Sequence, residues 1–167
     1  VKANAYGHGA IPIAKALEPL APALGVACIE EALELRESGI AKPILLLEGF
    51  FSPDELELAA AHNFWLMIQN ETQLRALESA RLSQPVHCWL KIDTGMHRLG
   101  FSAEDITAVY QRLMACDNVV KPLVLMTHLA NADQTNDDKT TQQLQRFLEF
   151  SDGCDGPKSI SNSAGIV

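Results

Sequence analysis

Four short blocks of the 167-residue sequence concentrate the side chains that can do chemistry. They are Lys2 with residues 4–9 (Asn-Ala-Tyr-Gly-His-Gly), residues 91–100 (Lys-Ile-Asp-Thr-Gly-Met-His-Arg-Leu-Gly), residues 127–133 and residues 162–164 (Asn-Ser-Ala). A divalent metal needs several carboxylates or imidazoles that converge, and only Asp93, His128 and Asp133 are available. The blocks are rich in amines, imidazoles and hydroxyls, so they favour an anionic organic ligand and no metal.

The first block suggests a reactive amine beside a phosphate site. A lysine at a strand end among small residues is desolvated, which lowers the pKa of its amine towards that of a nucleophile. Backbone amides of the Gly-His-Gly turn, with the hydroxyls of Tyr6 and Ser163, can bind a phosphate at a helix N-terminus. Taken alone, Lys2 is most often a solvated lysine, and Gly7 and Gly9 are ordinary turn residues.

The second and third blocks also have a structural interpretation. Lys91 lies in an apolar run, where an unpaired ammonium is costly to bury, and pairing with Asp93 or carbamylation would relieve that cost. Arg98 and Asp93 can instead form a purely structural ion pair, and His128 can be a hydrogen-bonded core histidine. The other histidines, at positions 8, 62, 87 and 97, are interpreted as structural or surface groups.

The elements that position these blocks alternate between short apolar runs and helical patterns. Counting residues 1–2 as the tail of a strand, the seven expected strands are 1–2, 24–29, 43–47, 64–68, 86–92, 123–126 and a last one that begins at 159–161. Helices are expected after the strands, among them 30–36, 71–82, 102–115 and 137–150. Glu30, Glu31 and Glu34 are expected on the solvent side of the first of these helices.

Continuous apolar strands that alternate with helices predict an α/β fold with a parallel sheet. An open doubly wound sheet and a closed (β/α)8 barrel of the TIM type both satisfy this rule. No Gly-x-Gly-x-x-Gly follows a strand, so a dinucleotide site has no support. A barrel needs eight strands and about 250 residues, and both chain ends look like cuts. We therefore expect residues 1–167 to form a single, incomplete barrel domain with about seven of the eight strands.

Composition narrows the partners and the compartment. The chain has 13 Lys plus Arg against 21 Asp plus Glu, a formal net charge of −8, which argues against nucleic acid and anionic membranes as partners. The longest uncharged stretch, residues 58–70, has 13 residues and is too short to span a bilayer. The cysteines, at positions 28, 88, 116 and 154, form no Cys-x-x-Cys pair and are expected to be free, buried thiols of a cytoplasmic protein.

Together the four blocks resemble the alanine racemase family. Residues 1–9 (Val-Lys-Ala-Asn-Ala-Tyr-Gly-His-Gly) are similar to its pyridoxal-phosphate lysine motif, and residues 91–100, 127–133 and 162–164 are similar to further blocks in the same order. The resemblance covers essentially the whole chain. It implies a pyridoxal 5'-phosphate-dependent isomerase, a cytoplasmic homodimer that interconverts L- and D-alanine and supplies D-alanine for peptidoglycan. On this resemblance we expect the C-terminal β domain of the family to lie outside these 167 residues.

The resemblance also implies roles at the cofactor. Lys2 would hold pyridoxal phosphate as an internal aldimine and act as one of two acid/base groups at the Cα of the amino acid. Tyr6 and Ser163 would bind the cofactor phosphate. Asn162 would lie near the cofactor, and His128 would lie behind its pyridine ring.

Two further roles concern the substrate side of the site. Arg98 would hydrogen-bond the phenolic oxygen of the cofactor and help to bind the substrate carboxylate. Lys91 would be the position that is often carbamylated in the family, where the resulting anion orients Arg98.

Two other functions remain open at this point. One is a non-enzymatic pyridoxal-phosphate carrier with the same barrel and lysine. The other is a barrel decarboxylase or racemase for a larger amino acid. The block at residues 91–100 argues against the carrier, because a carrier needs no group for a substrate carboxylate.

The resemblance places the second catalytic base on a tyrosine of the partner subunit's C-terminal domain. The chain contains only Tyr6, matched to a phosphate ligand, and Tyr110, in an expected helix. We therefore expect the isolated 167-residue chain to be inactive as a racemase and to bind pyridoxal phosphate weakly if at all. An alanine racemisation assay with added cofactor measures this, and normal turnover by the isolated chain would contradict it.

Overall fold

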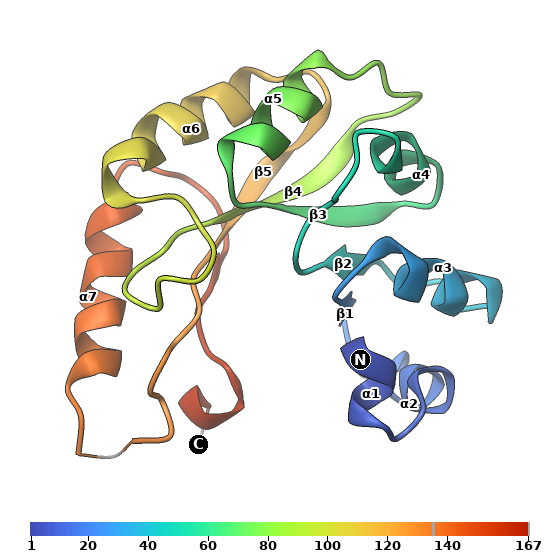
Figure 1. Ribbon diagram of the computed structural model, residues 1–167, viewed down its shortest axis with the longest axis horizontal. Helices are drawn as coiled ribbons and strands as arrows, with labels where there is room; N and C mark the ends of the chain where they lie inside the picture. The colour runs from blue at the N-terminus through green and yellow to red at the C-terminus, as the bar shows by residue number, and fades with distance from the viewer. Residues whose placement is uncertain (135, 167) are drawn as a thin grey trace.

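The computed structural model describes residues 1–134 and 136–166, so that Thr135 and Val167 lie outside it. Its strands are β1 (Leu24–Val26), β2 (Ile44–Leu46), β3 (Phe64–Ile68), β4 (Val86–Lys91), β5 (Val119–Met126) and β6 (Lys158–Ser159). All neighbouring strands are parallel, and they lie in the sheet in the order in which they occur in the sequence. The sheet is curled, as Figure 1 shows.

The helices are α1 (Lys2–Tyr6), α2 (Ala10–Leu17), α3 (Ile29–Glu37), α4 (Glu55–Ala61), α5 (Glu71–Ser79), α6 (Ala103–Ala115) and α7 (Lys139–Phe150), followed by a 3-10 turn, η1 (Ser163–Gly165). Helices α3 to α7 lie on the convex outer side of the curled sheet, and both chain ends lie towards its open side (Figure 1).

The order of the strands decides between the two fold classes. A doubly wound sheet reverses its strand order near the middle and carries helices on both faces. Here each strand adds to the same edge of the growing sheet, and the helices cover one face. This arrangement confirms the expected (β/α)8 architecture in an incomplete form.

The strand count differs from the expected seven, because the described residues contain six. Residues 1–2 do not join the ladder: the Val1 amino group donates to the Gly25 carbonyl at 2.7 Å, but at Lys2 the chain already enters the turn of α1. The first complete strand is also shorter than expected. It ends at Val26, because Cys28 is already the N-cap of α3.

The hydrophobic core lies between the sheet and the outer helices. Alternate residues of β3 (Phe64, Leu66 and Ile68) face this core and are fully buried. The opposite, concave face carries a cluster of rings, in which Trp65 lies 5.4 Å from His87 and 6.2 Å from Trp89 between ring centroids. Because side chains alternate along β4, Lys91 lies on the same concave face as Trp89 two residues earlier.

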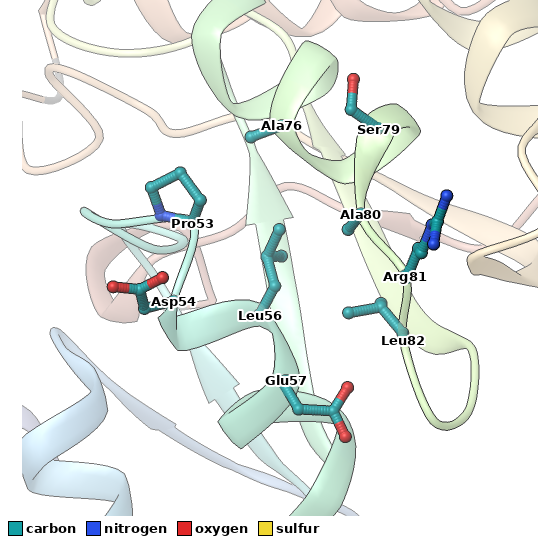
Figure 2. Close-up of a pocket in the computed structure, with 9 residues that line it drawn as sticks. All are labelled: Pro53, Asp54, Leu56, Glu57, Ala76, Ser79, Ala80, Arg81 and Leu82. Carbon is teal, nitrogen blue, oxygen red and sulfur yellow. The ribbon is translucent and has the colours of Figure 1, made fainter.

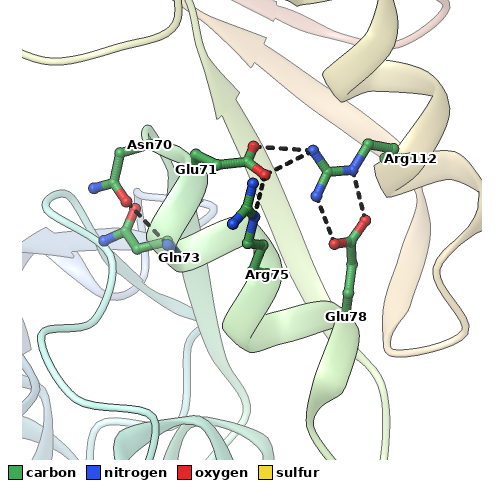
Figure 3. Close-up of polar contacts among 6 residues, drawn as sticks. All are labelled: Asn70, Glu71, Gln73, Arg75, Glu78 and Arg112. Atoms are coloured by element: carbon green, nitrogen blue, oxygen red, sulfur yellow. Dashed lines mark hydrogen bonds and ion pairs between the residues drawn. The ribbon is translucent and has the colours of Figure 1, made fainter.

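An ion-pair cluster joins α5 to α6 on the surface (Figure 3). The Arg112 guanidinium lies 2.6 Å from a carboxylate oxygen of Glu78 and 2.9 Å from one of Glu71, which also pairs with Arg75 at 2.6 Å. Hydrogen bonds from Arg112 and Arg75 lower the pKa of Glu71. These side chains are exposed, so each pair contributes little to stability and the cluster mainly sets the relative position of the two helices.

A surface groove lies between α4 and α5 (Figure 2). It is lined by Pro53, Asp54, Leu56, Glu57, Ala76, Ser79, Ala80, Arg81 and Leu82. None of the predicted site residues borders it. The groove therefore belongs to the outer layer and is separate from the site that the sequence predicts.

The four cysteines are free thiols, as expected; Cys88 and Cys154 are buried, whereas Cys28 and Cys116 are half-buried. Burial raises the pKa of the Cys88 thiol. No helix in the described part of the chain has the length and apolar character needed to cross a bilayer.

Gly49, in the turn after β2, is predicted to tolerate no side chain. Its φ is +72°, and a Cβ there would lie 2.3 Å from the Met67 carbonyl oxygen. Gly39 is a matched control, because its φ is +94° but a Cβ would meet nothing within 4 Å. In urea denaturation we expect Gly39→Ala to cost about 1–2 kcal/mol for the left-handed backbone alone. Gly49→Ala should lower the free energy of unfolding by about 1–3 kcal/mol more than Gly39→Ala, because the backbone at Met67 must also move. Equal losses would contradict the steric argument.

Candidate functional site

The candidate site lies at the carboxyl edge of the sheet, where the ends of all parallel strands meet. Lys91 is the last residue of β4, His128 follows β5, and Asn162 follows β6. Lys91, Asp93, Arg98, Thr127 and His128 line one small cleft, together with Ile92, Met96 and Leu99. The structure thus brings together three of the predicted residues, Lys91, Arg98 and His128.

Lys91 is buried without a counter-ion. Only 7% of the residue is exposed, and within residues 1–134 and 136–166 its ammonium has neither a hydrogen bond nor an ion pair. Burial lowers the pKa of Lys91, and the neighbouring positive charge of Arg98 lowers it further; Glu48 and Asp93 oppose this shift. The site therefore disfavours the charged form of this amine.

His128 lies in the same positive field. Burial lowers its pKa, and the charges of Lys91, Arg98 and Lys2 add to the shift. Its ring makes no hydrogen bond to any residue that the structure describes, in contrast to the core histidine considered from the sequence. Lys91, Arg98 and His128 thus act on one another at the cleft, and the charge of Lys2 acts on Lys91 and His128 from outside its lining.

Asp93 does not pair with Lys91 or Arg98, which corrects two of the structural interpretations. Its Oδ1 accepts the backbone N–H groups of residues 95–97 at 3.0–3.1 Å, and its Oδ2 lies 3.0 Å from Nδ1 of His97. Burial would raise the pKa of Asp93, but these hydrogen bonds and the charge of His97 lower it overall. Asp93 therefore organises the loop that carries Arg98, because the carboxylate satisfies amides that the turn leaves unpaired.

Gln143, which the sequence analysis missed, joins the two loops of the cleft. Its Nε2 donates to the His128 carbonyl at 3.0 Å and to the Thr94 hydroxyl at 3.3 Å, while its Oε1 accepts the Ala130 N–H at 2.8 Å. Thr94 in turn bonds the Thr127 hydroxyl at 2.8 Å. This buried network holds the loops after β4 and β5 in register.

Lys2 begins a left-handed turn. Ala3, Asn4, Ala5 and Tyr6 have φ between +50° and +53°, a conformation that costs about 1–2 kcal/mol for each residue with a side chain. Part of this cost is offset within the turn, because the Asn4 side-chain oxygen accepts the Ala10 N–H at 2.8 Å.

The glycine-rich turn does not offer the phosphate donors that the sequence suggested. The N–H groups of Gly7 and Gly9 both donate to the Asn4 carbonyl, and that of His8 donates to the Ala5 carbonyl. These three amides are therefore occupied within the turn. A phosphate bound here would need donors other than these three amides. Phosphate binding by the hydroxyls of Tyr6 and Ser163 remains a prediction.

The remaining predicted residues, Tyr6, Asn162 and Ser163, do not line the cleft. Tyr6 is exposed, and its ring centroid lies 6.0 Å from Nζ of Lys2. The Asn162 side chain donates to the Leu129 carbonyl at 3.1 Å and so joins the loops after β5 and β6. Ser163, the first residue of η1, is exposed.

One acidic residue is placed differently from the expectation. Glu30 and Glu34 are exposed on α3, but Glu31 is half-buried and accepts hydrogen bonds from Ala3 and Ala27. The solvent-facing position predicted for Glu31 was therefore wrong, because its carboxylate finds backbone donors on neighbouring segments.

The curled parallel sheet defines a protein of the (β/α)8-barrel class, with a cleft at its strand ends that is lined by Lys91, Arg98 and His128. A family model described as "Alanine racemase, N-terminal domain" matches residues 1–167. The chain belongs to the alanine racemase family.

Individual relatives agree with this family. Over all 167 residues the chain is 49% identical to "Alanine racemase, catabolic" of Pseudomonas aeruginosa and 51% identical to "Alanine racemase, biosynthetic" of Escherichia coli O6:H1. The chain spans 46% of the length of each.

Solved structures show the same fold. The crystal structure of the biosynthetic alanine racemase from Pseudomonas aeruginosa matches with a TM-score of 0.93 at 43% identity, over 99% of this chain and 46% of that one. The alanine racemase from Acinetobacter baumannii matches with a TM-score of 0.89 at 39% identity, over 99% of this chain and 49% of that one.

Replacement of Lys91 is predicted to stabilise the chain in a pH-dependent way. The pKa of Lys91 in the folded chain is below the 10.5 of the unfolded chain. At a pH between these two pKa values the unfolded state binds more protons than the folded state. The free energy of unfolding of the unmodified chain therefore rises with pH in this range. Lys91→Met removes the buried charge, and at pH 7 we expect a gain of about 1 kcal/mol or more in urea denaturation. The gain should shrink as the pH approaches 10.5.

The control for this experiment is Lys15→Met, on the exposed side of α2, which should leave the urea midpoint unchanged. A loss of stability in Lys91→Met at pH 7 would contradict the prediction.

Proposed function

We propose that a polypeptide of the relatives' length that contains this chain racemises alanine with pyridoxal phosphate, and that Lys2 is one of its two acid/base groups. The observation that carries this proposal is the convergence of Lys91, Arg98 and His128 on one cleft within the electrostatic reach of Lys2. Family membership supplies the reaction, and the positive cleft supplies the fit to an anionic cofactor and a carboxylate substrate.

The residues present fit pyridoxal phosphate. The cofactor is anionic at its phosphate and phenolic oxygens, and a buried positive cluster without a counter-ion favours such a ligand. Lys2 would bind its aldehyde carbon, Arg98 its phenolic oxygen, and Tyr6 and Ser163 its phosphate, with His128 and Asn162 beside the ring. When bound, the cofactor accepts the electron pair that is left when the Cα–H bond of alanine breaks.

The protein's own task is to move one proton. When the amino group of alanine replaces Lys2 at the aldehyde carbon, the released amine of Lys2 would take the Cα proton on one face, and a second group would return a proton on the other face. Tyr110 cannot be this group, because its hydroxyl is engaged by the Asp155 backbone at 3.0 Å on both its donor and acceptor sides. The resemblance to the family implies that the second group is a tyrosine of the partner subunit in a homodimer, and we propose the same arrangement here.

Lys91 and Arg98 would act on the substrate side. Arg98 would also bind the alanine carboxylate, which requires that its guanidinium be held in one orientation. Carbamylation of Lys91 would convert a buried cation beside Arg98 into an anion, and so turn repulsion into an attraction that orients the guanidinium. A Lys91 amine that is disfavoured in its charged form is suited to this reaction, because the neutral amine is the nucleophile that adds carbon dioxide.

The physiological role that we propose is the supply of D-alanine for peptidoglycan in the cytoplasm. Relatives named both biosynthetic and catabolic have about the same identity to the chain. The family therefore supports alanine as the substrate more directly than it supports a biosynthetic role over a catabolic one.

The role of Lys2 is tested by Lys2→Ala in the full-length protein, with Lys15→Ala as the control on α2. With pyridoxal phosphate, the unmodified protein and the control should show the long-wavelength absorbance of lysine-bound cofactor and convert D-alanine to L-alanine. Lys2→Ala should lose that absorbance and at least 1,000-fold in kcat, roughly the contribution of a general base. If the absorbance survives in Lys2→Ala, the assignment of Lys2 is wrong.

The same measurement separates the alternative functions. Cofactor absorbance that D-alanine leaves unchanged, without racemisation, would identify a non-enzymatic carrier. Turnover of larger amino acids in preference to alanine would identify a racemase or decarboxylase of different specificity.

A further inference from the structure

We propose that Glu31 is a positioning residue that holds the backbone of Lys2 in the orientation its chemistry requires. The proposal rests on the function proposed for Lys2, and it adds a residue from a different helix to the site. Glu31 lies in the first turn of α3 and does not border the cleft itself.

The contacts of Glu31 are divided between two segments. Its Oε1 accepts the N–H of Ala3 at 2.6 Å, and its Oε2 accepts the N–H of Ala27 at 2.8 Å. Ala27 lies in the connection between β1 and α3, whereas Ala3 follows Lys2 directly. One carboxylate therefore joins the lysine segment to the carboxyl end of the first strand.

The bond to Ala3 acts on Lys2 because of the geometry of the peptide. The N–H of Ala3 and the carbonyl of Lys2 belong to the same rigid plane. Holding that N–H restricts the ψ angle of Lys2, and thereby the direction in which its Cα–Cβ bond leaves the backbone. A side chain four carbons long magnifies any error in that direction at its amine.

The lysine segment needs such an external contact. Residues 3–6 all adopt the left-handed conformation, which is unfavourable for residues with a side chain. The segment is not part of the sheet, and the N–H groups of Gly7 and Gly9 and the side chain of Asn4 all bond within residues 1–10. The bond from Val1 to Gly25 lies before Lys2 and leaves the turn after Lys2 unrestrained. Glu31 provides a charge-assisted hydrogen bond from outside the segment, the stronger kind for a backbone donor.

Helix capping explains only half of this arrangement. A glutamate in the first turn commonly reaches back to a backbone N–H just before its helix, as Glu31 does towards Ala27. This interaction needs one oxygen. The second oxygen contacts a residue 28 positions away, which contributes nothing to the cap of α3.

Three substitutions in the full-length protein separate positioning from capping. Glu31→Gln keeps the length of the side chain but presents an NH2 group to one of the two N–H donors. Glu31→Asp keeps a carboxylate at the N-terminus of α3 and is one methylene too short to reach both segments. Glu34→Gln is the matched control, because Glu34 lies on the same helix and is exposed.

The first measurement is hydrogen exchange of the cofactor-free proteins, followed in the peptide that covers residues 2–9. We expect both Glu31 variants to exchange there about tenfold faster than the unmodified protein and Glu34→Gln, which corresponds to the loss of one hydrogen bond to a charged group. Thermal unfolding should show that all variants remain folded. Unchanged exchange in both Glu31 variants would overturn the proposal.

The second measurement is the dissociation constant of pyridoxal phosphate, followed by the absorbance of lysine-bound cofactor. We expect both Glu31 variants to bind pyridoxal phosphate roughly tenfold more weakly, the same factor by which their hydrogen exchange in residues 2–9 is faster. Faster exchange with unchanged affinity would also overturn the proposal, because the contact would then be structural only. If the unmodified protein binds no pyridoxal phosphate, the function proposed for Lys2 is wrong, and the positioning role of Glu31 is wrong with it. Hydrogen exchange in residues 2–9 would still report whether Glu31 restrains the backbone after Lys2.

Discussion

The parallel ladder of β1 to β6 is the constraint on which the rest of the structure depends. Because every strand runs in the same direction and adds to the same edge of the sheet, the six carboxyl ends meet at one rim. Residues 91, 98 and 128 can share a cleft only for this reason. The same constraint places helices α3 to α7 on the convex face, where the apolar sides of β1 to β5 are buried.

The cleft brings Lys91 and Arg98 together without a negative partner for Lys91 among the described residues. Lys91 is buried near Arg98, and among residues 1–134 and 136–166 no carboxylate bonds to it. The oxygens of Asp93 instead accept hydrogen bonds from the backbone of its own loop and contact His97. In a core that served stability alone, such a charge would be paired or replaced by an apolar residue. The ligand and the Lys91 modification that we propose would each bring negative charge to this part of the site.

Polar side chains that touch no ligand hold the cleft together. Asp93, Gln143 and Glu31 each accept backbone N–H groups: Asp93 within its own loop, Gln143 and Glu31 between segments that the sheet alone would leave independent. The pattern of Gln143 was open to prediction, since a glutamine four residues before the buried Phe147 lies on the apolar face of α7. Glu31 carried no such signal, because acidic residues in the first turn of a helix are common and usually solvated.

The sequence by itself determined the class of fold and the family. Apolar runs of strand length between helical patterns predict a parallel α/β sheet, and the limits of β3 (Phe64–Ile68) and α6 (Ala103–Ala115) agree with local periodicity and capping. The tertiary structure decided the conformation after Lys2, the partners of Asp93 and the role of Glu31. The donors to Asp93 are close in sequence, but they converge on its carboxylate only once the loop has folded. The contact of Glu31 with Ala3 arises only because segments 28 residues apart are brought together.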